Sequence, residues 1–212
     1  AVVIYLRLLY YPGGFKFPLA PMDQVALITE LLREVATIIM LFGIGMLAGR
    51  TKVQRFSFFI LSFAIWDIFY YVFLKLILDW PSSMLTWDIL FLVPVPWIGP
   101  VVTPCIVSLT MILLAGVLCI RESQNGTAWI NLTEWLTLGF GSLVVLVSWT
   151  WDYFSFDPGN GLTSAEKSAL FFSTHQPQTF NWWLFGIGEL ILLAAVVIYF
   201  RRTSGKAAVK VQ

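Results

Sequence analysis

The sequence predicts an all-α integral membrane protein: a bundle of five transmembrane helices with a re-entrant or interfacial segment on its outer face. The first observation is composition, because 58% of the 212 residues are hydrophobic and only 12% are charged, whereas soluble domains carry about 25% charged residues. The second is a set of five apolar segments of spanning length, and the third is an uneven distribution of basic residues between their loops. We therefore expect residues 1–212 to form a single transmembrane domain.

Five apolar segments reach the length of a membrane span, which is about 20 residues at roughly 1.5 Å of rise each. We expect helices in all five, because open strands would leave backbone polar groups unpaired in lipid. The predicted spans are residues 25–47, 56–78, 101–120, 129–149 and 182–200.

The chain begins with the apolar stretch AVVIYLRLLYY, which is too short to cross a bilayer. It has no basic region before the apolar part and no small-residue cleavage site after it, so it does not resemble a secretory signal. We expect either an interfacial segment or the end of an upstream helix, which would bring the number of spans to six.

Two outer loops, residues 79–100 and 150–181, hold the irregular structure. In the first, the apolar stretch MLTWDILFLVPVPWIGP is too short to span and is interrupted by Pro94, Pro96 and Pro100. It predicts an interfacial or re-entrant half-helix, and a lid packed on the bundle is favoured over a pore element. In the second loop, the sequence from Thr163 to Glu166 fits a capping box and predicts a short helix.

Basic residues gather in the loops on one side of the predicted membrane, whereas the other side has three basic residues against six acidic ones. The positive-inside rule then places the N-terminus of this chain outside and its C-terminus in the cytoplasm. We expect the cytoplasmic membrane of a bacterium or archaeon. The basic residues of the cytoplasmic side are Arg50, Lys52, Arg55, Arg121, Arg201, Arg202, Lys206 and Lys210.

Six ionisable residues lie within the predicted spans, where charge is costly and is by default a sign of function. Asp67 stands at the midpoint of the second span, and Glu189 lies at nearly the same depth as Glu34. The residues Glu30, Arg33 and Glu34 are spaced i, i+3 and i+4, so they share one helix face. The full set is Glu30, Arg33, Glu34, Asp67, Lys75 and Glu189.

Depths estimated from helix rise suggest two ion pairs between the first and second spans. Arg33 matches Asp67 near the midplane, and Glu30 matches Lys75 near the outer boundary. The two spans are joined by a short loop and are therefore expected to be neighbours. We predict that both pairs form across this helix pair.

The charges inside the membrane do not balance, because four acids meet two bases. Glu34 and Glu189 are the acids expected to lack a cationic partner. Such carboxylates need a proton, a cation from a partner chain or a wet cavity. These three solutions correspond to a proton-handling or structural role, to a subunit of a complex and to a transporter.

Cofactors and metals are not expected. The sequence holds a single histidine, His175, whereas haem with two axial histidines and typical zinc or copper sites need more. The outer-face acids Asp79, Asp88 and Asp152 are the one candidate group for a divalent ion, although caps or solvated side chains are the favoured interpretation. A bound lipid is left open, and no basic stripe predicts a nucleic acid.

Three functions fit these observations. The first is a non-catalytic accessory or scaffolding subunit of a larger membrane complex of respiratory or photosynthetic type, with the lipid bilayer and other subunits as partners. The alternative is a small transporter or a proton or cation pathway that uses midplane carboxylates. The third is a lipid-binding protein or intramembrane enzyme. The interpretation leans against an enzyme, because no nucleophile–base or phosphate-loop pattern occurs.

Overall fold

The computed structural model describes residues 2–12, 14–19, 24–125, 129–157, 159, 161 and 163–209. The fold prediction is confirmed, since five of its helices are long and apolar enough to cross a membrane. The long helices are α2 (Gln24–Ala48), α3 (Lys52–Leu78), α4 (Val102–Asn125), α5 (Leu132–Ser155) and α7 (Trp182–Val209). The short elements are α1 (Val2–Tyr10), α6 (Ser164–Thr174) and the strands β1 (Trp87–Phe91) and β2 (Trp97–Pro100).

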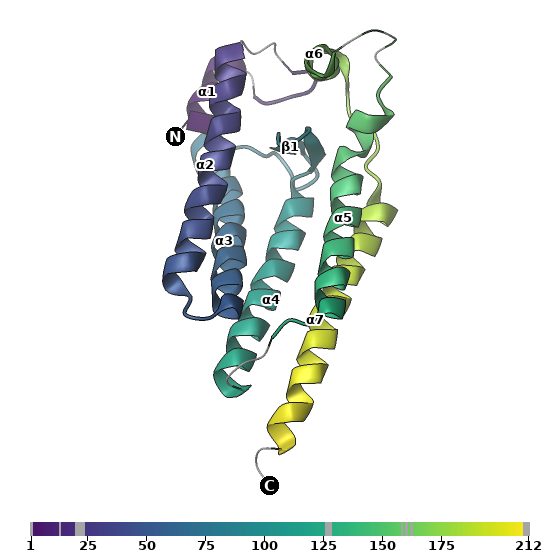
Figure 1. Cartoon of the computed structure of the whole chain (residues 1–212). Helices are drawn as coiled ribbons and strands as arrows, with labels where there is room; N and C mark the ends of the chain where they lie inside the picture. The colour runs from purple at the N-terminus through teal and green to yellow at the C-terminus, as the bar shows by residue number, and fades with distance from the viewer. Residues whose placement is uncertain are drawn as a thin grey trace.

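The long helices run side by side and leave the bundle with two unlike ends (Figure 1). The first, called the hairpin end below, carries α1, β1, β2 and α6. The second, called the basic end, carries the α2–α3 and α4–α5 connections and the end of α7. The predicted cytoplasmic basic residues that are described lie toward this second end, while Lys210 lies outside the described residues.

The segment 84–100 is not a half-helix, and this prediction was wrong. It forms a β-hairpin in which β1 pairs with β2 antiparallel, with Trp87 opposite Pro100 and Ile89 opposite Ile98. Its prolines disfavour a helix because they lack an N–H and push the preceding residue toward extended backbone. The hairpin is packed within the protein, since Ile98 is buried. Strands at membrane depth are tolerated where the surrounding protein buries them.

Helix ends follow the local capping signals. An Asn131 side chain caps α5 and forms a reciprocal capping box with Glu134, so α5 begins three residues later than the predicted span and runs on to Ser155. Asp152 is thereby placed on a helix rather than in a loop. The capping box at Thr163 and Glu166 is confirmed and starts α6. The hydrogen bond from Thr163 lowers the pKa of Glu166.

The α5–α7 contact depends on glycine at its closest point. A Cβ atom on Gly188 would lie 2.8 Å from Val145 Cγ2 and 2.9 Å from Val145 N. On the facing helix, a Cβ on Gly141 would lie 3.0 Å from a Leu192 methyl carbon. Small residues of this kind let two transmembrane backbones approach closely.

Gly188→Ala is expected to lower the free energy of unfolding by about 1–3 kcal/mol, because the added methyl forces α5 and α7 apart. Reversible unfolding in mixed detergent micelles, followed by circular dichroism, measures the change. Gly186→Ala is the matched control, since its Cβ would meet no atom within 4 Å. Equal stability of the two variants would contradict the close contact.

Candidate functional site

A cavity of about 100 Å³ lies between α1, α2, α3 and β1 near the hairpin end. We call it the acidic chamber, because four carboxyl groups and two guanidinium groups line it. Aromatic side chains, including Trp66 and Tyr70, complete its wall. The ionisable lining residues are Arg7, Glu30, Arg33, Glu34, Asp67 and Asp88.

The most deeply buried ion pair of the chamber joins Arg7 of α1 to Asp88 of β1. A guanidinium nitrogen lies 2.8 Å from Asp88 Oδ1, and the carboxylate is fully buried. Tyr71 donates a hydrogen bond to Asp88 Oδ2 at 3.2 Å, while Arg7 donates to the Tyr70 hydroxyl at 3.3 Å. The guanidinium also lies 4.0 Å from the ring centroid of Trp80, a cation–π contact. This pair ties the N-terminal helix to the hairpin.

Each member of this pair favours the charged form of the other. Burial raises the pKa of the Asp88 carboxyl, although the Arg7 guanidinium and the Tyr71 hydroxyl act in the opposite direction. Burial alone would lower the pKa of Arg7, but Asp88 and Tyr70 raise it above its usual value, so the guanidinium stays charged. Either group left alone would be a buried polar group without its partner.

The predicted Arg33–Asp67 pair does not form. Arg33 Nε donates instead to Glu30 Oε1 at 2.9 Å, one turn away on α2. Asp67 Oδ2 accepts a hydrogen bond from the Ser108 hydroxyl of α4 at 2.9 Å. Equal depth in the membrane does not fix the direction in which a side chain leaves its helix, and Asp67 is hydrogen-bonded to α4 rather than to the Arg33 side chain.

The predicted Glu30–Lys75 pair does not form either. Lys75 Nζ lies 2.7 Å from Asp79 Oδ1 and donates to the Pro81 carbonyl at 3.1 Å. A lysine in the last turn of a helix is attracted by the free carbonyls and the negative end of the helix dipole. Its hydrogen bond lowers the pKa of Asp79, which is an exposed capping residue of α3.

Glu34 and Asp67 are the two chamber carboxyls that form no ion pair with another described residue. Glu34 is buried and accepts the backbone N–H of Leu92 at 3.0 Å, so it is held against the hairpin. Among the described residues, the Ser108 hydroxyl is the one hydrogen-bond partner of Asp67. Both carboxyls thus rely on a single neutral donor each.

Asp67 also lines a second cavity, which we call the central cavity. It measures about 260 Å³ and lies between α3, α4, α5 and α7, beneath the hairpin. Its wall is mainly apolar, with Ser108 and Ser142 as its other polar side chains. The residues that border both cavities are Trp66, Asp67, Leu90 and Phe91. Asp67 therefore stands between an acidic compartment and an apolar one.

Glu189 is not part of the chamber, so the predicted midplane cluster of Glu34, Asp67, Glu189 and Arg33 is divided. Glu189 Oε1 accepts a hydrogen bond from Thr110 of α4, and Oε2 is buried with no hydrogen-bond partner in the described part of the chain. Thr110 and Ser108 are two residues apart, and this spacing directs them to nearly opposite sides of a helix. Helix α4 thus lies between the two acidic groups.

The outer-face acids occupy three different settings. Asp88 is enclosed in the chamber, Asp79 is exposed beside Lys75, and Asp152 Oδ2 lies 3.2 Å from His175 Nε2. Across the described ranges, no group of three potential metal ligands comes together. The divalent-ion site considered for these acids is therefore not formed.

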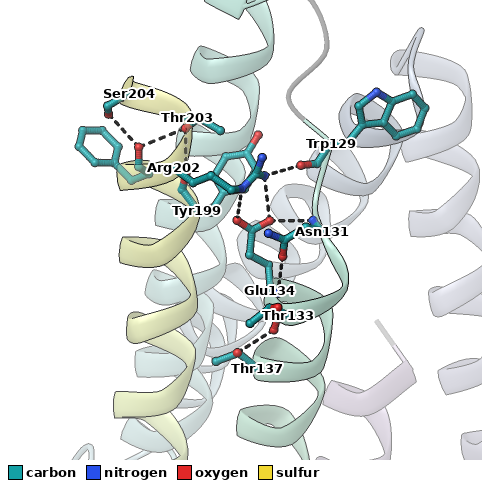
Figure 2. A network of polar contacts seen from close by, with 10 residues as sticks. Trp129, Asn131, Thr133, Glu134, Thr137, Tyr199, Arg202, Thr203 and Ser204 are labelled. Carbon is teal, nitrogen blue, oxygen red and sulfur yellow. Dashed lines mark hydrogen bonds and ion pairs between the residues drawn. The ribbon is translucent and has the colours of Figure 1, made fainter. Parts of the chain in front are cut away.

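Sequence reasoning missed one further ion pair, at the basic end. Arg202 Nε of α7 lies 2.6 Å from Oε1 of Glu134, at the start of α5. Figure 2 shows the Glu134 carboxylate held between Arg202 and the Asn131 backbone, which donates to Oε2 at 2.8 Å. The Asn-x-x-Glu spacing was the available signal.

Comparison with family models, with curated proteins and with solved structures finds no match. The residues of the acidic chamber are therefore the main indication of function. The chamber holds two ion pairs, Arg7–Asp88 and Arg33–Glu30, whose charges cancel. It also holds two carboxyls with no cation beside them among the described residues, and one of these, Asp67, borders the central cavity as well.

Proposed function

We propose that this protein is a small transporter or a proton or cation pathway, with Asp67 as the carboxylate that takes up and releases the positive charge. The observation that carries the proposal is the position of Asp67, which lines both the acidic chamber and the central cavity. A group that exchanges a proton or cation between two compartments has to reach both.

The charge balance of the chamber supports this proposal. Arg7 neutralises Asp88 and Arg33 neutralises Glu30, which leaves two formal negative charges. A carboxylate in the membrane interior without a charged partner needs a proton, a cation or water. The chamber therefore has capacity for positive charge beyond its own arginines.

The path is closed toward the basic end in this conformation. A buried apolar cluster that includes Ile60, Leu118 and Tyr199 fills the bundle there. Transport would require this cluster to open, as in an alternating-access cycle. With the basic end in the cytoplasm, as the positive-inside rule suggests, the chamber would load from the outside.

Asp67→Asn is expected to abolish proton flux into liposomes that hold the reconstituted protein. Asparagine keeps the size of the side chain and its hydrogen bond with Ser108, but it cannot carry a proton or balance a cation. A trapped pH-sensitive dye, read under a potassium diffusion potential, measures the flux. The rate should fall to that of protein-free liposomes, and parallel assays with Na⁺ and K⁺ separate protons from metal cations.

Glu189→Gln is the matched control, because Glu189 is also a buried carboxyl held by a hydroxyl of α4 but lies outside both cavities. It should retain the flux of the unmodified protein. Equal flux from the Asp67→Asn variant and the unmodified protein would exclude Asp67 as the carrier. Loss of flux in the Glu189 variant alone would move the pathway to the other side of α4.

The accessory-subunit role stays a prediction, because a single chain contains no partner. It has a direct test in native mass spectrometry after mild detergent extraction. A defined complex with other membrane proteins would favour it, whereas a solitary protein that conducts protons in liposomes would favour the pathway.

A further inference from the structure

A third cavity lies at the hairpin end, away from the acidic chamber, and measures about 650 Å³. It is formed by the last turn of α5, the segment 175–181 and the first turn of α7. Volumes of about 300–1,000 Å³ are usual for small-molecule sites. It shares no lining residue with the acidic chamber or the central cavity.

Five aromatic side chains form much of the wall of this third cavity. They come from both helices and from the segment between them, and the three tryptophans are also exposed at the surface of the protein. The rings of Phe180 and Trp182 stand nearly perpendicular, with centroids 5.0 Å apart and an interplanar angle of 80°. The aromatic lining residues are Trp151, Phe156, Phe180, Trp182 and Trp183.

The charge of the wall is negative. Asp152 and Asp157 both line the cavity, and none of its described lining residues is Lys or Arg. His175 also lines it, with Nε2 3.2 Å from Asp152 Oδ2, so the negative charge of the wall rests mainly on Asp157. The C-terminal end of α5, at Ser155, adds the partial negative charge of the helix dipole. The positive end of α7 is partly neutralised, because Asn181 Oδ1 accepts the Leu184 N–H at 3.1 Å.

We propose that this third cavity binds a small methylated ammonium cation, of the choline type. Aromatic faces attract such cations through the ring quadrupole, and a carboxylate beside them adds a full opposing charge. Tryptophans at the ends of spans also form ordinary interfacial belts. A belt alone does not explain why the Asp157 carboxylate and five aromatic rings line the same cavity.

Choline chloride is the probe, with binding to the full chain in maltoside detergent measured by isothermal titration calorimetry. Asp157→Asn and Trp183→Leu are each expected to weaken binding by about tenfold. Both residues are exposed, so neither substitution threatens the fold. Trp183→Phe should restore most of the affinity lost in Trp183→Leu, because it returns an aromatic face.

Asp79→Asn serves as the control, since Asp79 is an exposed acid of the same end that does not line this cavity. It should bind choline as the unmodified protein does, and sodium chloride at equal ionic strength should not displace the probe. Unchanged affinity in the Asp157→Asn and Trp183→Leu variants, or no binding at all by the unmodified protein, would overturn the proposal.

Two sources of the same cation are separated by repeating the titration in nanodiscs. If the natural ligand is a lipid headgroup, phosphatidylcholine in the bilayer should compete with choline, whereas phosphatidylglycerol should not. If it is a free solute, choline should bind equally in both membranes. Either result supports the ammonium site, and liposome flux through the Asp67 pathway is measured separately from both.

Discussion

Replacing Asp88 by alanine is expected to lower the free energy of unfolding by about 3–5 kcal/mol. The Arg7 side chain is 9% exposed and that of Asp88 is 0% exposed, so the substitution strands a charged guanidinium away from water. Arg7 would retain its hydrogen bond to Tyr70 and its ring contact with Trp80, but neither supplies a negative charge. Detergent unfolding followed by circular dichroism gives the change.

The double variant Arg7→Met with Asp88→Leu should be less damaging than Asp88→Ala alone. Removing both charges avoids the unpaired group, and the apolar side chains fill similar volume. Lys75→Met is the control for charge removal at the same end, because its pair with Asp79 is solvent-exposed and such pairs contribute little. Additive losses from Arg7 and Asp88 would show that the two residues stabilise the protein independently.

The long helices could be predicted because length and apolarity are properties of a single segment. A span such as 25–47 can be recognised without reference to any neighbouring segment, and α2 covers it. The hairpin was not predicted because each of its strands is stabilised by hydrogen bonds to the other, which the sequence of one segment does not reveal. The three prolines indicated that no helix crosses the membrane there, but the half-helix expected in its place was wrong, because the pairing of Ile89 with Ile98 can be found only by considering two segments together.

The partners of the buried charges were harder to predict than their presence. Depth along a helix follows from residue counting, but the direction of a side chain around the axis depends on packing. Asp67 accordingly binds Ser108, and Lys75 extends past the C-terminal end of its own helix to the Pro81 carbonyl. The pairing of Arg7 was not predicted, because its segment is too short to span the membrane and its partner carboxylate, on Asp88, lies 81 residues later in the chain.

Loss of Arg202 is expected to be the second large effect, with a decrease of about 3 kcal/mol in the free energy of unfolding. Glu134 is enclosed, with a side-chain exposure of 1%, and accepts two bonds from the guanidinium, at 2.6 and 3.0 Å. This loss of stability is smaller than for a fully buried pair because the Arg202 side chain is 28% exposed. Arg202→Met removes the charge while keeping the alkyl stem, and detergent unfolding measures the result.

Glu134 both pairs with Arg202 and completes the capping box of α5, and substitutions can separate these two roles. Glu134→Gln removes the charge but can still accept the Asn131 N–H, whereas Glu134→Ala loses the capping box of α5 as well. We therefore expect Glu134→Ala to be the more damaging of the two, and Glu134→Gln to recover part of the stability lost in Arg202→Met. Arg201→Met is the neighbouring control, since Arg201 is exposed. If Arg201 and Arg202 prove equally important, the basic charge of this end matters rather than the pair of Arg202 with Glu134.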